Sequence, residues 1–117
     1  MVQNLQTLLT DGLVAFVKRA CPTCALIEPQ MREASAVRAD FQVVTQDHAA
    51  FPAGVTNKLH DAELDHSYLN NIEATPTLIL FAAGREVERV MGWDRAGWQR
   101  LTGIATIGAS LPPLQPG

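Results

Sequence analysis

The sequence predicts an α/β fold in which helices flank both faces of one mixed, four-stranded sheet. Apolar, β-branched runs alternate with segments of helical periodicity, and only a short turn separates the last two runs. A helical connection makes the first two strands parallel, whereas a tight turn makes the last two antiparallel. We expect a single domain over residues 1–110, followed by an extended tail or truncated linker at 111–117.

Each element has a local signal. Apolar spacing predicts helices over 2–10, 26–37, 62–69 and 95–105, and apolar runs predict strands over 13–18, 41–45, 77–81 and 86–90. Pro29 removes a backbone donor and should kink the second helix. Asp61 and Asp94 are candidate N-caps for the last two helices, the first of which should bury Leu64 and Tyr68. Residues 82–85 form a hairpin turn.

Charge and hydropathy exclude several classes of function. The net charge is −3 and no cluster of Lys or Arg follows one face, so nucleic acid is not an expected partner. No apolar run has the length of a membrane span, and the N-terminal residues show no secretory signal. We therefore expect a cytoplasmic monomer with no membrane partner, in which a cysteine pair cycles rather than forming a static disulfide.

The only two cysteines lie at the junction between the first strand and the second helix. They form the motif Cys21-Pro22-Thr23-Cys24. Free N–H groups at a helix start favour a thiolate, which makes Cys21 the candidate nucleophile with its sulfur facing solvent and Cys24 the resolving cysteine. Half of a zinc site and a pair of inert buried cysteines are the competing interpretations. No second C-x-x-C completes a zinc site, so redox chemistry is favoured.

Together with this motif, three further features resemble the thioredoxin family. Pro29 matches the proline of the active-site helix, Thr75-Pro76-Thr77 matches the cis-proline loop, and Gly92 matches a glycine of the substrate groove. The resemblance implies a thioredoxin-like fold and thiol-disulfide oxidoreductase activity in cell redox homeostasis. The redox-active disulfide Cys21–Cys24 would need no other cofactor, and the partners would be a protein disulfide substrate and an unidentified reductase. The substrate-binding residues would be Pro22, Thr23, Thr75, Pro76, Gly92 and Trp93.

Several positions depart from the family pattern. Ala20 replaces the usual tryptophan before the first cysteine, and Ala15 replaces a buried acid that is thought to assist proton transfer at the second cysteine. A glutaredoxin-like protein is a near neighbour of this interpretation, although Ala74 stands where that family usually has a threonine. An iron–sulfur carrier or a low-turnover interaction module could be built on the same fold as well.

Residues 46–61 resemble an insertion that should rise beside the cysteine loop. Phe51 and Val55 could supply apolar contacts, and Asp47 and His48 polar contacts, for a lid that selects protein partners. His48, His60 and His66 lie in or beside it, but their spacing does not predict a metal site.

Overall fold

The computed structural model describes residues 11–117, so the helix expected over 2–10 lies outside the described residues. The strands are β1 (Gly12–Val17), β2 (Phe41–Thr45), β3 (Lys58–His60), β4 (Thr77–Ala82), β5 (Arg85–Met91), β6 (Trp93–Asp94) and β7 (Leu114–Gln115). The helices are α2 (Pro22–Leu26), α3 (Glu28–Val37), α4 (Asp65–Leu69) and α5 (Arg95–Thr102). The α/β class is confirmed.

The main sheet has five strands in the order β3-β2-β1-β4-β5. Strand β1 runs parallel to β2 and antiparallel to β4, and β4 and β5 form the predicted antiparallel hairpin. The predicted number of four strands is wrong, because Lys58–His60 pairs in parallel with Val43–Thr45 as an edge strand. Three residues with a single apolar member give too short a pattern to predict a strand.

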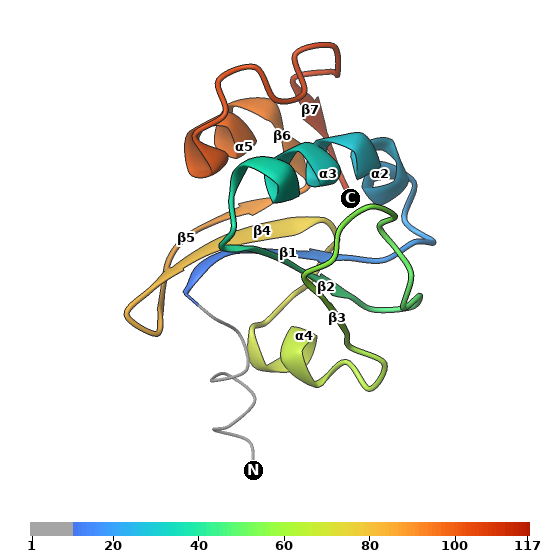
Figure 1. Ribbon diagram of the computed structural model, residues 1–117. Helices are drawn as coiled ribbons and strands as arrows, with labels where there is room; N and C mark the ends of the chain where they lie inside the picture. Colours follow the sequence, from blue (N-terminus) through green and yellow to red (C-terminus); the bar gives the residue numbers. More distant parts are fainter. Residues whose placement is uncertain (1–10) are drawn as a thin grey trace.

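Helices cover both faces of this sheet. Figure 1 shows α2, α3 and α5 on one face and α4 on the other. The larger core lies against the first group of helices and contains both cysteines together with Ala15. The smaller core on the α4 side contains Val14 and Phe16. All six residues of β1 are buried, as expected for a central strand that is covered on both faces.

The predicted second helix is interrupted at Ile27, between α2 and α3. The N–H of Ile27 donates to the carbonyl of Thr23 at 3.1 Å, and that of Met31 donates to Ile27 at 3.0 Å. Pro29 has no N–H to donate to the carbonyl of Ala25, so the regular ladder cannot continue through this turn. The kink expected at Pro29 is therefore a break two residues earlier, with Pro29 in the first turn of α3.

The predicted burial of Leu64 and Tyr68 is wrong. Leu64 has a positive φ of 62° and is half-exposed, and Tyr68 is 82% exposed. The left-handed residue reverses the chain, so α4 begins at Asp65 and turns His66 inward instead. The predicted N-cap position of Asp61 is also wrong, because Leu64 is the N-cap residue of α4. The buried carboxylate of Asp61 still accepts the N–H groups of His66 at 3.1 Å and Ser67 at 2.9 Å in the first turn.

The predicted N-cap of the last helix is confirmed. Asp94 is the N-cap of α5, and its side chain accepts the N–H of Gly97 at 3.2 Å. The helix ends earlier than expected, at Thr102, because Gly103 adopts a left-handed C-cap with φ of 73°. Trp98 and Leu101 on its inner face complete the larger core.

Candidate active site

Cys21 is placed at the point where β1 turns into α2. It is the N-cap residue of α2, with an extended backbone, and its sulfur accepts the N–H of Cys24 at 3.3 Å. Pro22 occupies the first turn, where a missing N–H costs no helical hydrogen bond. The motif therefore directs a backbone donor at the first sulfur.

The loop before β4 lies directly against Cys21. The thiol of Cys21 donates to the carbonyl oxygen of Thr75 at 3.3 Å, although the two residues are 54 positions apart. The Thr75–Pro76 peptide bond is cis. The N–H of Gly92 donates to the carbonyl of Pro76 at 2.7 Å, so this glycine lies on the far side of the same loop.

The two thiols have opposite electrostatic environments. Burial raises the pKa of Cys21, but hydrogen bonds from Cys24, from the side chain of Thr75 and from the backbone of Thr23 together lower it by more, and the net pKa lies below the ordinary thiol value. For Cys24, burial and then the hydrogen bond and charge of Cys21 raise the pKa to about 12. Near neutral pH the pair thus holds one activated sulfur and one protonated sulfur.

The prediction that the Cys21 sulfur faces solvent is wrong, because Cys21 is only 4% exposed. An open cavity of about 360 Å³ lies beside it and is lined in part by Pro22, Thr75 and Gly117. Thr23 is also buried, and its hydroxyl donates to the carbonyl of Pro116 at 2.6 Å. C-terminal residues therefore form part of the wall around the cysteine, which no pattern in the sequence indicated.

The ring of Trp93 belongs to the core rather than to an open groove. Trp93 is 1% exposed, its ring centroid lies 5.4 Å from that of Trp98, and its indole N–H donates to the carbonyl of Pro112 at 2.8 Å. The backbone of Trp93, by contrast, pairs with Gln115. Trp93 therefore presents its main chain, and not its ring, to the segment that lies beside the cysteines.

Asp47 was predicted only as a polar contact of the lid, and its role at the cysteine loop was missed. Its carboxylate accepts the N–H groups of Arg19 at 2.6 Å and Ala20 at 3.0 Å, immediately before Cys21. Burial raises the pKa of Asp47, but these N–H bonds lower it more, so the net pKa is below its usual value. An acidic residue just after a predicted strand was the only available signal. Asp47 fixes the loop that carries the nucleophile.

Segment 46–61 rises beside the cysteine loop, as expected, but its apolar residues are not those of a lid. A cavity lined by Arg19, Asp47 and Phe51 lies between the two loops. Phe51 is 6% exposed and Val55 is 2% exposed, and both belong to the larger core. The lid contacts predicted for these two side chains are wrong, since the segment uses them to attach itself to the domain.

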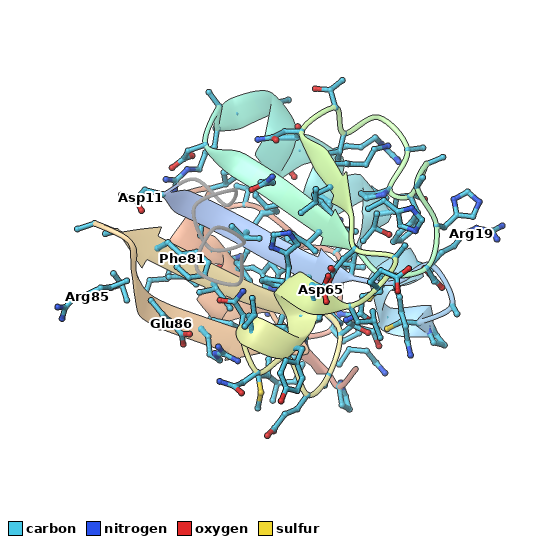
Figure 2. All side chains as sticks on the ribbon, turned by 90° about the horizontal axis from the view of Figure 1, so that it is seen from below. Asp11, Arg19, Asp65, Phe81, Arg85 and Glu86 are labelled. Carbon is cyan, nitrogen blue, oxygen red and sulfur yellow. The ribbon has the colours of Figure 1, made fainter. Side chains whose placement is uncertain are left out.

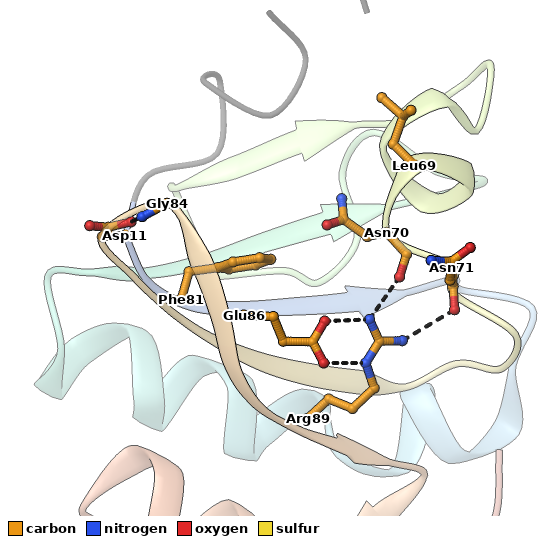
Figure 3. A pocket seen from close by; sticks show the side chains of 8 residues that line it. All are labelled: Asp11, Leu69, Asn70, Asn71, Phe81, Gly84, Glu86 and Arg89. Carbon is orange, nitrogen blue, oxygen red and sulfur yellow. Dashed lines mark hydrogen bonds and ion pairs between the residues drawn. The ribbon is translucent and has the colours of Figure 1, made fainter. Parts of the chain in front are cut away.

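A third cavity, of about 180 Å³, lies between α4 and the β4–β5 hairpin (Figure 3). Arg89 donates to both carboxylate oxygens of Glu86 and to the carbonyls of Asn70 and Asn71, at 2.6 to 3.1 Å. Figure 2 places Glu86 near one end of the sheet and Arg19 at the other. These bonds use four of the five N–H donors of the guanidinium and join α4 to β5. This cavity shares no lining residue with the cavity beside Cys21.

Within residues 11–117, no group of three or more His, Cys, Asp or Glu side chains is arranged to hold a metal ion. Across the same part of the chain, no helix combines the length and apolar character needed to cross a bilayer.

Comparison with solved structures identifies the fold. MTB DsbF superimposes with a TM-score of 0.65 and 16% identity, over 84% of this chain and 83% of that one. Mitochondrial thioredoxin 3 from Saccharomyces cerevisiae gives 0.60 and 16%, covering 89% and 88%. Thioredoxin from Aeropyrum pernix gives 0.58 and 24%, covering 90% and 81%. No family model and no curated protein sequence matches the chain. The chain has a thioredoxin-like fold with a C-x-x-C motif.

Proposed function

We propose that this protein is a thiol-disulfide oxidoreductase that exchanges disulfides with a protein partner through Cys21 and Cys24. The observation that carries this proposal is the placement of Cys21 at the N-cap of α2, where its sulfur accepts the N–H of Cys24 at 3.3 Å. In keeping with this placement, the pKa of Cys21 is lowered, whereas that of the buried Cys24 is raised to about 12. A nucleophile must be a thiolate at working pH, whereas a resolving thiol can wait in its protonated form.

The reductive half of the cycle has two steps. The Cys21 thiolate attacks one sulfur of the substrate disulfide, which forms a mixed disulfide and releases the other substrate sulfur as a thiolate. Cys24 then attacks Cys21, the second substrate sulfur leaves, and the departing thiolate takes up the proton of Cys24. The substrate gains two electrons and the chain becomes the Cys21–Cys24 disulfide. An external dithiol reductase returns both electrons and one proton, which regenerates the Cys21 thiolate and the Cys24 thiol.

The site residues have distinct parts in this cycle. The N–H of Cys24 stabilises negative charge on Cys21. Thr75 and Pro76 border the cysteine on the side that an extended substrate would approach, and Gly92 allows a close backbone on the opposite side. Asp47 holds the preceding loop in position. The proposal therefore needs no metal or organic cofactor.

A low-turnover interaction module is the second candidate, and one observation favours it. Ala15 lies in the same core as Cys24 and supplies no acid to accept its proton. Burial raises the pKa of Cys24, and a thiol that is slow to form a thiolate resolves a mixed disulfide slowly. Slow catalytic turnover together with strong binding of an extended peptide would favour this candidate over an efficient reductase.

Catalysed reduction of a model protein disulfide, such as that of insulin by dithiothreitol, tests the proposal. The parent chain should accelerate the reduction, and Cys21→Ser should fall to the uncatalysed rate. The matched control is Ala25→Ser, which adds a hydroxyl at an exposed position of the same helix and should retain the parent rate. Equal rates for the parent and Cys21→Ser would disprove the proposed chemistry.

A further inference from the structure

Residues Leu114–Gly117 lie beside the active site as an added strand. Leu114 and Gln115 form β7, which pairs in antiparallel fashion with Asp94 and Trp93 of β6. The carbonyl of the next residue, Pro116, accepts the hydroxyl of Thr23 within the cysteine motif. Figure 1 accordingly shows the C-terminal end of the chain beside α2. The segment thus connects β6 to the cysteine loop through its backbone.

Two glycines make this approach possible. At Gly92, where φ is +70°, a Cβ atom would lie 3.2 Å from the carbonyl oxygen of Gln115 and 3.3 Å from Cα of Pro116. At Gly117, a Cβ atom would overlap with the carbonyl oxygen of Thr75. Thr75 is also the residue whose carbonyl accepts the Cys21 thiol. The segment therefore fits where only a residue without a side chain can lie against Thr75.

The course of the preceding residues is fixed by donors at the start of α5. The N–H of Arg95 donates to the carbonyl of Pro113 at 2.9 Å, and its guanidinium donates to that of Leu111 at 2.9 Å. The indole of Trp93 holds Pro112 in the same way. These contacts direct the chain toward the cysteines and keep the last four residues close to β6, Thr23 and Thr75.

Backbone contacts, and not apolar burial, hold the last four residues in place. Leu114 is 67% exposed, and the three residues after it are also exposed. Net stabilisation by a backbone hydrogen bond is modest, of order 1 kcal/mol, so such a segment exchanges readily between bound and released states. An external peptide with the same backbone geometry can then take its place.

We propose that the groove between β6, Thr23 and Thr75 is a binding site for an extended peptide, and that Leu114–Gly117 occupies it in cis. The peptide class is an extended segment with glycine at the position that faces Thr75 and proline immediately before it. This inference rests on the proposed function only in naming the groove as the substrate site. The bound segment competes with protein substrates and covers Cys21.

Tethering determines how strongly Leu114–Gly117 competes with an external peptide for the groove. A tethered segment has an effective concentration in the millimolar range, which suffices to keep a weak site occupied for most of the time. If the groove is open for about one-tenth of the time, the apparent affinity for an external peptide falls about tenfold. The same fraction lowers the rate at which a small reagent reaches Cys21 by about tenfold.

The test uses Gly117→Val, whose side chain would collide with Thr75, and the matched control Ser110→Val at an exposed position before the segment. The probe is a synthetic peptide with the sequence of residues 111–117 and an amidated end. Its affinity is measured by calorimetry on the fully reduced proteins, in the absence of any disulfide. Gly117→Val should bind it about tenfold more tightly than the parent and Ser110→Val do.

A second peptide with valine at its last position should bind none of the three proteins. Equal affinity of the first peptide for all three proteins, or no binding by Gly117→Val, would overturn the proposal. Iodoacetamide labelling of Cys21 gives an independent reading and should be about tenfold faster in Gly117→Val; an unchanged rate would also overturn it. Because no disulfide turnover enters these measurements, they can fail while the oxidoreductase proposal stands, and the reverse also holds.

Discussion

The backbone N–H of Cys24 lies 3.3 Å from the sulfur of Cys21 and donates to it. The second cysteine thus stabilises the thiolate of the first through its main chain, while its own buried thiol stays protonated. A single helical turn gives the two sulfurs different chemistry because it exposes them to different donors and to different degrees of burial.

The first prediction concerns the pH dependence of alkylation. A lowered pKa moves the rise in thiolate to lower pH, so labelling of Cys21 should reach half its maximum rate at a lower pH than labelling of the same thiol in the unfolded chain. Cys24, with a pKa of about 12, should remain almost unlabelled across the same range. Mass spectrometry of the labelled peptides measures both. Faster labelling of Cys24 than of Cys21 near neutral pH would contradict the assignment of roles.

The second prediction concerns Asp47. Asp47→Ala removes the acceptor of two N–H groups and should therefore destabilise the fold. The expected loss at neutral pH is only roughly 1 kcal/mol, because solvent screens the exposed carboxylate. Since the folded pKa is depressed, this stabilisation is present above the unfolded pKa of about 4 and is lost as the pH falls through the folded value. The difference between parent and variant in urea unfolding should therefore shrink in acid.

Asp47→Asn serves as the control for this effect, because it keeps one acceptor oxygen and removes the charge. It should retain part of the stability and lose the pH dependence. A difference between parent and Asp47→Ala that stays constant down to about pH 2 would show that the carboxylate charge has no part in holding the loop.

The third prediction concerns segment 46–61. Phe51→Ala should lower the free energy of unfolding by about 3 kcal/mol, because it leaves a cavity in the larger core. Val37→Ala, at a side chain that is 64% exposed, should change it by less than about 0.5 kcal/mol. Urea unfolding measures both variants. If the two variants are equally stable, Phe51 is a surface contact and the segment is a detachable lid after all.

The sequence carries most of the information on the cysteine site, because that site is built from local motifs in a fixed order. Cys21, Cys24, Thr75 and Pro76 meet where the motif order implied. Strand β3 (Lys58–His60) was not predicted, because its hydrogen-bonded pairing with β2 defines it as a strand and its own apolar pattern does not.

The C-terminal segment was the largest omission. Leu114–Gly117 is held by its backbone, and backbone contacts leave no periodic side-chain pattern in a sequence. The prediction that the Cys21 sulfur faces solvent did not take this segment into account, and Gly117 lines the cavity beside the sulfur. The wrong prediction for Tyr68 has a different cause, since one left-handed residue at Leu64 rotates the whole face of α4.

The most direct test of the two-cysteine mechanism is capture of the mixed disulfide. Cys24→Ser should attack a substrate disulfide but fail to resolve it, so that a covalent 1:1 adduct through Cys21 accumulates and is visible by mass spectrometry without reductant. Cys21→Ser should form no adduct under the same conditions, because the remaining thiol is fully buried and burial raises its pKa. An adduct in Cys21→Ser, or its absence in Cys24→Ser, would contradict the assignment of Cys21 as the nucleophile.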